Sequence, residues 1–266
     1  MKKIVLAFVI LLFTANCFAQ KEKSKKQIRR ENRKEKVTAM VKQEEEGVIV
    51  NKKHFLSAIK LTNDGFGGFI EKGIAQSIGK ALLFQLELTE RFHPKEQKQT
   101  FLTPSGVISF KYGKINFLYP VKLGVQQQIL LGNKGNRNGI SVTGNFGGGL
   151  SLGLERPYLL GFDTVINNVR QIQYKKYSED TTAFLNGSNI AGPGFGKGFN
   201  KMKVNPGLYV KAALRFDYGA YNEIISAIEV GITTEFYSKK VQQMAKIEGK
   251  NLFFGAYVSL LFGKRK

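Results

Sequence analysis

From residue 54 onward, hydrophobic and polar side chains alternate along most of the chain. In residues 205–219 every second position builds an apolar face of Leu208, Val210, Ala212, Leu214, Phe216 and Tyr218. The interleaved positions are Tyr209, Lys211, Ala213, Arg215 and Asp217. A period of two is that of a β-strand, whose successive side chains point to opposite sides of the sheet. The pattern and its turn residues predict eight strands, at about 54–62, 66–74, 80–90, 115–128, 139–154, 205–219, 223–238 and 251–263.

Two all-β architectures use such strands. A soluble sandwich turns the apolar face inward, whereas a membrane barrel turns it toward lipid and keeps polar residues in the lumen. The longest predicted strands exceed the mean of about 5–6 residues for strands. The two longest connections, about 91–114 and 155–204, fall on one side, and the turns on the other side are short. We therefore predict an all-β, eight-stranded, antiparallel, up-and-down transmembrane β-barrel over 51–266.

The polar faces of the predicted strands carry charges of both signs. They are Lys60, Glu71, Glu87, Lys122, Lys211, Arg215, Asp217, Glu229 and Glu235. An eight-stranded barrel is only wide enough for side chains to fill its interior. We expect these charges to neutralise one another there, with Arg215 and Glu229 as diagonal neighbours on one hairpin. A barrel whose lumen is filled in this way would not act as a porin.

The N-terminus predicts the compartment. Two lysines, an apolar run and a small-residue site form a secretory signal peptide cleaved after Ala19. Cys17 lies inside it, and Asn16 before it disfavours lipidation, so the mature chain would contain no cysteine. Residues 20–50 are rich in charge and poor in apolar residues, which predicts a basic periplasmic arm that is partly helical or disordered. The arm and the C-terminus are both expected in the periplasm.

The formal net charge of +21 bears on partners. The connection 155–204 contributes seven cations that are candidates for lipopolysaccharide contact: Arg156, Arg170, Lys175, Lys176, Lys197, Lys201 and Lys203. Each cation near an anionic membrane surface contributes about 1 kcal/mol, although solvated loop charge is an equal alternative. Nucleic acid attracts the same charges, but secretion would separate the protein from it. The expected partners are outer-membrane lipid, lipopolysaccharide and an envelope protein complex.

Candidate chemistry is sparse. His54 and His93 should lie at opposite ends of the barrel, and neither has the spacing of a metal site. A lipase would need His93 beside Ser105 or Ser109. The glycine-rich stretch 192–199 lacks the spacing of a phosphate loop and is expected to be a flexible loop. We expect no catalytic residue, metal or cofactor.

Several motifs carry a resemblance: HPKE at 93–96, GNKGNRNG at 132–139, GGGLSLGLERPY at 147–158, GFGKGF at 194–199 and PGLYVKAALRFDYG at 206–219. In these the sequence resembles a family of small outer-membrane β-barrel proteins of the Bacteroidota. The resemblance implies a barrel in the outer membrane and transfers no catalytic residue. The favoured hypothesis is a non-enzymatic accessory or structural subunit of an envelope biogenesis or secretion complex. The alternatives are a lipid A-modifying enzyme and a narrow channel.

Overall fold

The structure is a computed structural model, and it divides the chain into two units, Met1–Val50 and Asn51–Lys266. It describes residues 29–32, 34–35, 38, 53–77, 79–103, 106–134, 139–166, 168–186, 190–194, 196–219 and 223–265. The described residues of the first unit are helical and exposed. There the Thr38 hydroxyl donates a hydrogen bond of 3.0 Å to the carbonyl of Lys34. The predicted signal peptide and most of the predicted arm lie outside the described residues.

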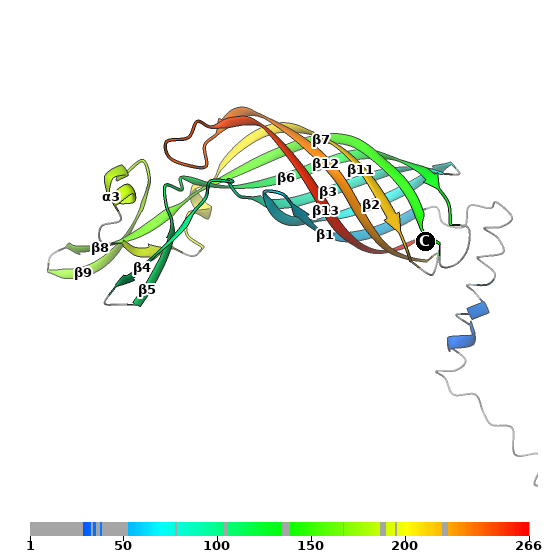
Figure 1. Ribbon diagram of the computed structural model, residues 1–266, viewed down its shortest axis with the longest axis horizontal. Coiled ribbons are helices and arrows are strands. Elements are labelled where there is room, and N and C mark those ends of the chain that lie inside the picture. The colour runs from blue at the N-terminus through cyan, green and yellow to red at the C-terminus, as the bar shows by residue number, and fades with distance from the viewer. Residues whose placement is uncertain are drawn as a thin grey trace, which may run out of the picture. The chain divides into compact units, whose positions relative to one another are not determined.

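Eight strands of the second unit close into an antiparallel barrel (Figure 1). They are β1 (Lys53–Thr62), β2 (Gly65–Ser77), β3 (Lys80–Arg91), β6 (Asn116–Gly132), β7 (Ser141–Pro157), β11 (Lys203–Asp217), β12 (Ile224–Val241) and β13 (Lys250–Arg265). Each strand pairs with the next one along the ring, and β1 closes the ring against β13. The predicted eight-stranded, up-and-down, antiparallel arrangement is confirmed, with each predicted strand within a few residues of an observed one.

The two long connections leave the same end of the barrel, which we call the loop end. The opposite end, where the chain enters β1 and leaves β13, is the terminal end. One connection holds β4 (Lys98–Thr103) and β5 (Gly106–Lys111). The other holds β8 (Leu159–Ile166), β9 (Val169–Lys176), α3 (Thr181–Asn186), β10 (Ile190–Pro193) and the 3₁₀ turn η1 (Phe199–Lys201). The expected flexible loop over 192–199 is corrected at its start only, because residues 192 and 193 belong to β10, which pairs with β8.

These additional elements form a platform with a core of its own. Its buried members are Phe110 on β5, Tyr158 beside β8, Leu160 and Phe162 on β8, and Phe184 on α3. The backbone N–H of Lys111 donates a hydrogen bond of 2.9 Å to the Tyr158 hydroxyl, which ties β5 to the start of β8. We refer to β4, β5, α3 and β8–β10 together as the loop-end platform.

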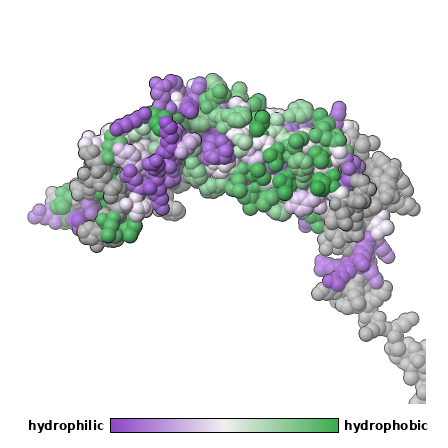
Figure 2. All heavy atoms as spheres, in the orientation of Figure 1, coloured by the Kyte–Doolittle hydropathy of each residue, from purple (hydrophilic) through white to green (hydrophobic). Residues whose placement is uncertain are grey.

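The barrel wall is apolar on its outer surface and polar on its inner surface. Ile59 and Leu260 point outward and are 65% and 44% exposed, whereas their chain neighbours Lys60 and Ser259 are 0% and 1% exposed. Figure 2 shows hydrophobic residues spread over the wall of the barrel. The period of two in the sequence thus indicates an inverted sheet, with most of its large hydrophobic side chains outside and most of its charged ones inside.

Candidate functional site: a filled ionic lumen

All nine charged residues that the sequence assigned to the lumen lie inside the barrel, with exposed fractions of 4% or less. Arg91, at the end of β3, joins them at 5% exposure. The predicted strand ended one residue earlier, which is why the pattern missed it. With Arg91 included, the buried charged residues of the described barrel strands are five cations and five carboxylates, so the lumen charges balance.

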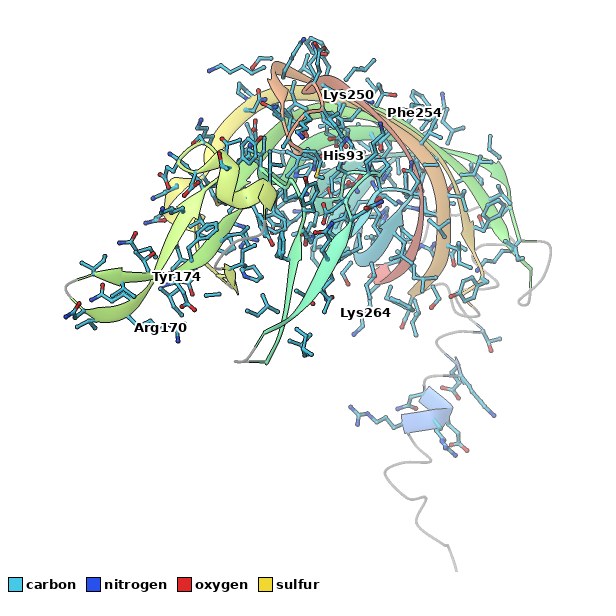
Figure 3. The ribbon with its side chains drawn as sticks, turned by 60° about the vertical axis from the view of Figure 1, so that its left-hand side comes forward. His93, Arg170, Tyr174, Lys250, Phe254 and Lys264 are labelled. Carbon is cyan, nitrogen blue, oxygen red and sulfur yellow. The ribbon has the colours of Figure 1, made fainter. Side chains whose placement is uncertain are left out.

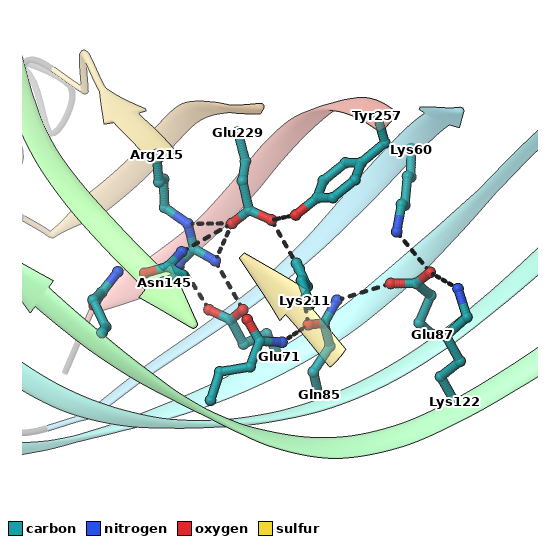
Figure 4. A network of polar contacts seen from close by, with 12 residues as sticks. Lys60, Glu71, Gln85, Glu87, Lys122, Asn145, Lys211, Arg215, Glu229 and Tyr257 are labelled. Atoms are coloured by element: carbon teal, nitrogen blue, oxygen red, sulfur yellow. Dashed lines mark hydrogen bonds and ion pairs between the residues drawn. The ribbon is translucent and has the colours of Figure 1, made fainter. Parts of the chain in front are cut away.

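Arg215 is clamped between two carboxylates (Figure 4). Its terminal nitrogens donate to both oxygens of Glu71 at 2.8 Å. Its Nε and Nη2 donate to Glu229 Oε2 at 2.9 and 2.7 Å. The register places Arg215 directly opposite Glu229, not diagonal to it as expected. A planar guanidinium with five donors suits such double recognition.

Glu229 is the most connected carboxylate of the lumen. Its Oε1 accepts hydrogen bonds from the Lys211 ammonium at 2.8 Å and from the Tyr257 hydroxyl at 2.7 Å. The Asn145 amide donates to Glu229 Oε2 at 3.0 Å. Four side chains donate to Glu229: one from β7, two from β11 and one from β13. Glu229 therefore holds several strands of the ring to one point.

A second group of charges lies around Glu87. Its Oε1 accepts the ammonium groups of Lys60 at 2.7 Å and Lys122 at 2.9 Å. Lys122 also pairs with Glu235 at 2.7 Å. Gln85 joins the two groups, because it donates to Glu87 at 3.3 Å and accepts from Lys211 at 3.1 Å. The hydrogen-bonded chain therefore continues from one group into the other.

Arg91 extends this chain toward the loop end. It pairs with Asp64 at 2.8 Å and lies 3.6 Å from Glu235. The ninth predicted residue, Asp217, stands apart and contacts Arg265, with Lys134 at 3.7 Å. The structure thus joins eight of the nine predicted residues and Arg91 into one network and leaves Asp217 in a separate cluster.

Apolar clusters adjoin the ionic network inside the barrel. One lies on β1, β2, β12 and β13 and consists of Leu56, Ala58, Phe69, Ile225, Ala227 and Leu261. The other contains Leu118, Tyr237 and Val241, with Phe253 packed against them. No sequence pattern singled out these apolar clusters inside the barrel.

Residues 242–249, between β12 and β13, form a strap at the loop end. The backbone N–H of Ile115 donates to the carbonyl of Gln243 at 2.8 Å, and that of Ala245 donates to Gly113 at 2.7 Å. The Gln243 side chain donates to the carbonyl of Arg91 at 2.9 Å. The strap therefore reaches from β12 and β13 to strands on another part of the ring.

Of the seven cations proposed for lipopolysaccharide contact, five lie in the connection from β7 to β11, whereas Arg156 belongs to β7 and Lys203 begins β11. Three of them form exposed or half-exposed ion pairs: Arg170 with Asp163 at 3.6 Å, Lys175 with Asp180 at 3.1 Å and Lys176 with Glu179 at 3.5 Å. Lys197 lies over the ring of Tyr174 at 5.4 Å, and Lys201 and Lys203 are exposed. Exposed pairs of this kind contribute little stability.

Arg156, the seventh, belongs to a cation–aromatic cluster. Its guanidinium carbon lies 4.3 Å from the centroid of Phe117, and the ammonium groups of Lys111 and Lys114 lie 5.0 and 5.2 Å from the same centroid. Glu96 contacts both lysines. Burial raises the pKa of Glu96, but the two ammonium groups outweigh it and hold that pKa below its ordinary value. No sequence pattern pointed to this cluster.

The histidines do not form a catalytic arrangement with the candidate serines in the described part of the chain. His93 Nδ1 accepts the backbone N–H of Lys95 at 3.2 Å, and the Ser109 hydroxyl is 2.9 Å from that of Thr100. Ser105 lies outside the described residues. Burial and the Lys114 charge lower the pKa of His93. Figure 3 shows His93 beside Lys250 and away from Lys264. The other histidine, His54, contacts Glu71 at 3.2 Å.

Among the described residues, no group of three or more His, Cys, Asp and Glu side chains is arranged to hold a metal ion. The same residues include no helix that is long and apolar enough to cross a membrane.

No protein-family model and no curated protein sequence matches the chain. The solved structures that are similar to it include the following two. Neisserial surface protein A is 10% identical and has a TM-score of 0.36, over 80% of this chain and 96% of that protein. The N-terminal β-barrel domain of OprF from Pseudomonas aeruginosa is 9% identical and has a TM-score of 0.33, over 80% of this chain and 98% of that domain.

Proposed function

We propose that this chain is an integral outer-membrane protein. Its barrel would act as a closed anchor and its platform as the binding part of an accessory or structural subunit in an envelope biogenesis or secretion complex. The observation that carries the proposal is the inverted wall, in which large hydrophobic side chains point outward and a balanced ionic network fills the inside. Such a wall exposed to water would be a very large apolar patch, whereas acyl chains solvate it.

The strand lengths fit this role. A tilted transmembrane strand needs about 9–11 residues, and β1, the shortest barrel strand, has 10. The strands β6, β7 and β12 have 17, 17 and 18 residues, so they would extend past the bilayer. The extensions of β6 and β7 lead into the connections that carry the platform. A barrel of this shape would fix a folded surface at the membrane boundary.

The filled lumen supports an anchor over a channel. A water-filled pore needs unoccupied width, and eight strands leave room only for side chains. Here Lys60, Tyr237 and Leu261 are among the side chains with no exposed surface. The separate hydrogen-bond partners of His93 and Ser109 likewise favour a non-enzymatic role over lipid A modification.

The loop-end cations would contribute to binding. The cluster of Lys111, Lys114 and Arg156 around Phe117 places three cations near two carboxylates, Glu96 and Glu90. Lipopolysaccharide phosphates would compensate this excess of positive charge. The platform beside the cluster would then be held at the membrane surface, where a protein partner could dock.

The test is purification of the full-length protein from outer membranes in mild detergent, beside a variant in which residues 159–193 are replaced by a short Gly-Ser linker. Gel mobility with and without boiling would check that the variant barrel is folded. We expect the wild type to retain defined partner proteins that the variant loses. Recovery of the wild-type barrel alone would contradict the proposed role.

A further inference from the structure

The outward face of the barrel is apolar almost everywhere, yet Lys72 interrupts it. Along β2 its outward neighbours are Ile70 and Ile74, which are 46% and 36% exposed. Across the sheet it lies directly opposite Phe55 on β1 and Phe84 on β3. Residues opposite each other in antiparallel strands point to the same face. Lys72 is therefore an exposed cation with apolar side chains on all four sides.

A second lysine completes the row. Phe55 lies opposite Lys72 on one side and opposite Lys264 of β13 on the other. The three residues thus share one face on three adjacent strands. Phe55, which is 57% exposed, has one lysine on each side. Neighbouring strands are about 4.8 Å apart, so the two lysine backbones are separated by roughly 10 Å. One phosphate group between the lysine side chains could contact both ammonium groups.

Among the described residues at the terminal end, the exposed cations at outward positions lie on one side of the ring. Lys53 of β1 and Lys80 of β3 are also exposed there, so β13, β1, β2 and β3 each supply one. The outward positions near the same end of β6, β7 and β11 hold Leu131, Ile140 and Tyr218 instead. Among the described residues, no ion pair joins Lys72 or Lys264 to a carboxylate. The positive charge of this sector is therefore not neutralised by described protein side chains.

We propose that Lys72, Phe55 and Lys264 form a binding site for the headgroup of an anionic phospholipid in the leaflet that surrounds the terminal end. This inference rests on the proposed membrane-spanning role. A lysine on a lipid-facing wall is costly unless its ammonium group reaches the interface or a counter-ion. The phosphodiester would lie between the two ammonium groups, and the acyl chains would lie along Phe55 and Ile59, which are both exposed.

The chain offers a clean reporter for this site because it contains no tryptophan. The full-length protein with Phe55→Trp would be reconstituted in vesicles that contain brominated phosphatidylglycerol or brominated phosphatidylcholine in an unlabelled background. A matched reporter, Ile140→Trp, lies at the same end beside β7, the strand opposite β1 in the ring. We expect stronger quenching of Trp at 55 by the anionic lipid, with equal quenching by both lipids at 140.

The lysines should account for the preference. Each cation near an anionic surface contributes an energy equivalent to roughly a fivefold change in local lipid enrichment. Lys72→Gln and Lys264→Gln should each lower the enrichment at position 55 by about that factor, while quenching by phosphatidylcholine stays the same. Equal enrichment in the variants and the parent would overturn the site.

Two further outcomes separate the sources of failure. If neither brominated lipid quenches Trp at 55, the membrane-spanning role itself is wrong. If both lipids quench it equally, the barrel spans the membrane and only the site is wrong. Addition of inorganic phosphate at constant ionic strength should leave the preference intact. Its loss would mean that the lysines bind a free anion and not a lipid, which would also overturn the proposal.

Discussion

Replacing Glu229 with glutamine removes the most connected charge of the lumen and keeps the shape of the side chain. Arg215 would keep both of its hydrogen bonds to Glu71. Lys211 would lose its carboxylate partner at 2.8 Å and keep only neutral acceptors, such as the Gln85 oxygen at 3.1 Å. The variant therefore leaves one buried cation without a counter-charge, and not two.

Removal of one partner from a buried ion pair costs about 3–5 kcal/mol. Because Arg215 remains compensated, we expect a loss near the lower limit, about 3 kcal/mol in the free energy of unfolding. With a urea dependence of about 3 kcal/mol per molar, the unfolding midpoint would fall by roughly 1 M. The assay is urea unfolding of the protein in vesicles, followed by the gel mobility of unboiled samples.

The matched control is Glu248→Gln in the strap, where the carboxylate is 95% exposed. It should leave the urea midpoint unchanged. The double variant Glu229→Gln with Lys211→Met should recover much of the lost stability, because the unpaired charge is then removed as well. If Glu229→Gln and Glu248→Gln unfold at the same urea concentration, the lumen network does not stabilise the barrel in the way described.

Three further predictions follow from other parts of the molecule. The stability that Glu96 contributes is present above its ordinary pKa and is lost as pH falls through its lowered pKa. The difference in Tm between the wild type and Glu96→Gln should therefore narrow on acidification, and a constant difference would contradict this. A Cβ at Gly153 would lie 2.8 Å from the Tyr237 ring, so Gly153→Ala should lower the free energy of unfolding in urea by about 1–3 kcal/mol. A Cβ at Gly132 would have no atom within 4 Å, so Gly132→Ala should change it little. Equal effects of the two substitutions would refute the packing argument. The wild-type protein should give no discrete conductance in planar bilayers, since its lumen is filled, and stable current steps would show an open pathway.

The barrel could be predicted from the sequence because its wall obeys one rule along every strand. Alternation fixes which face a residue occupies, so the lumen positions of Lys60 and Glu229 could be read from the chain. The cross-strand partner depends instead on register, which alternation does not determine. For that reason Arg215 and Glu229 were expected as diagonal neighbours, although they lie directly opposite each other.

The loop-end platform escaped prediction for a related reason. In β8 the first four residues are all buried, so the strand shows no alternation. The strap is also invisible to pattern analysis, because its contacts at Ile115 and Gly113 are made by backbone groups. Backbone hydrogen bonds between distant segments leave no signature in the residue types, and only the folded ring brings these segments together.

The central claim is that the apolar face of the wall meets lipid and the charged face does not. A cysteine scan of residues 256–262 on β13 tests it most directly, with a spin label at each position in turn, after removal of Cys17, the only cysteine of the chain. In reconstituted vesicles, collisions with oxygen should peak at 256, 258, 260 and 262 and fall at the positions between them. Peaks at the intervening positions, or no periodicity, would contradict the inverted wall.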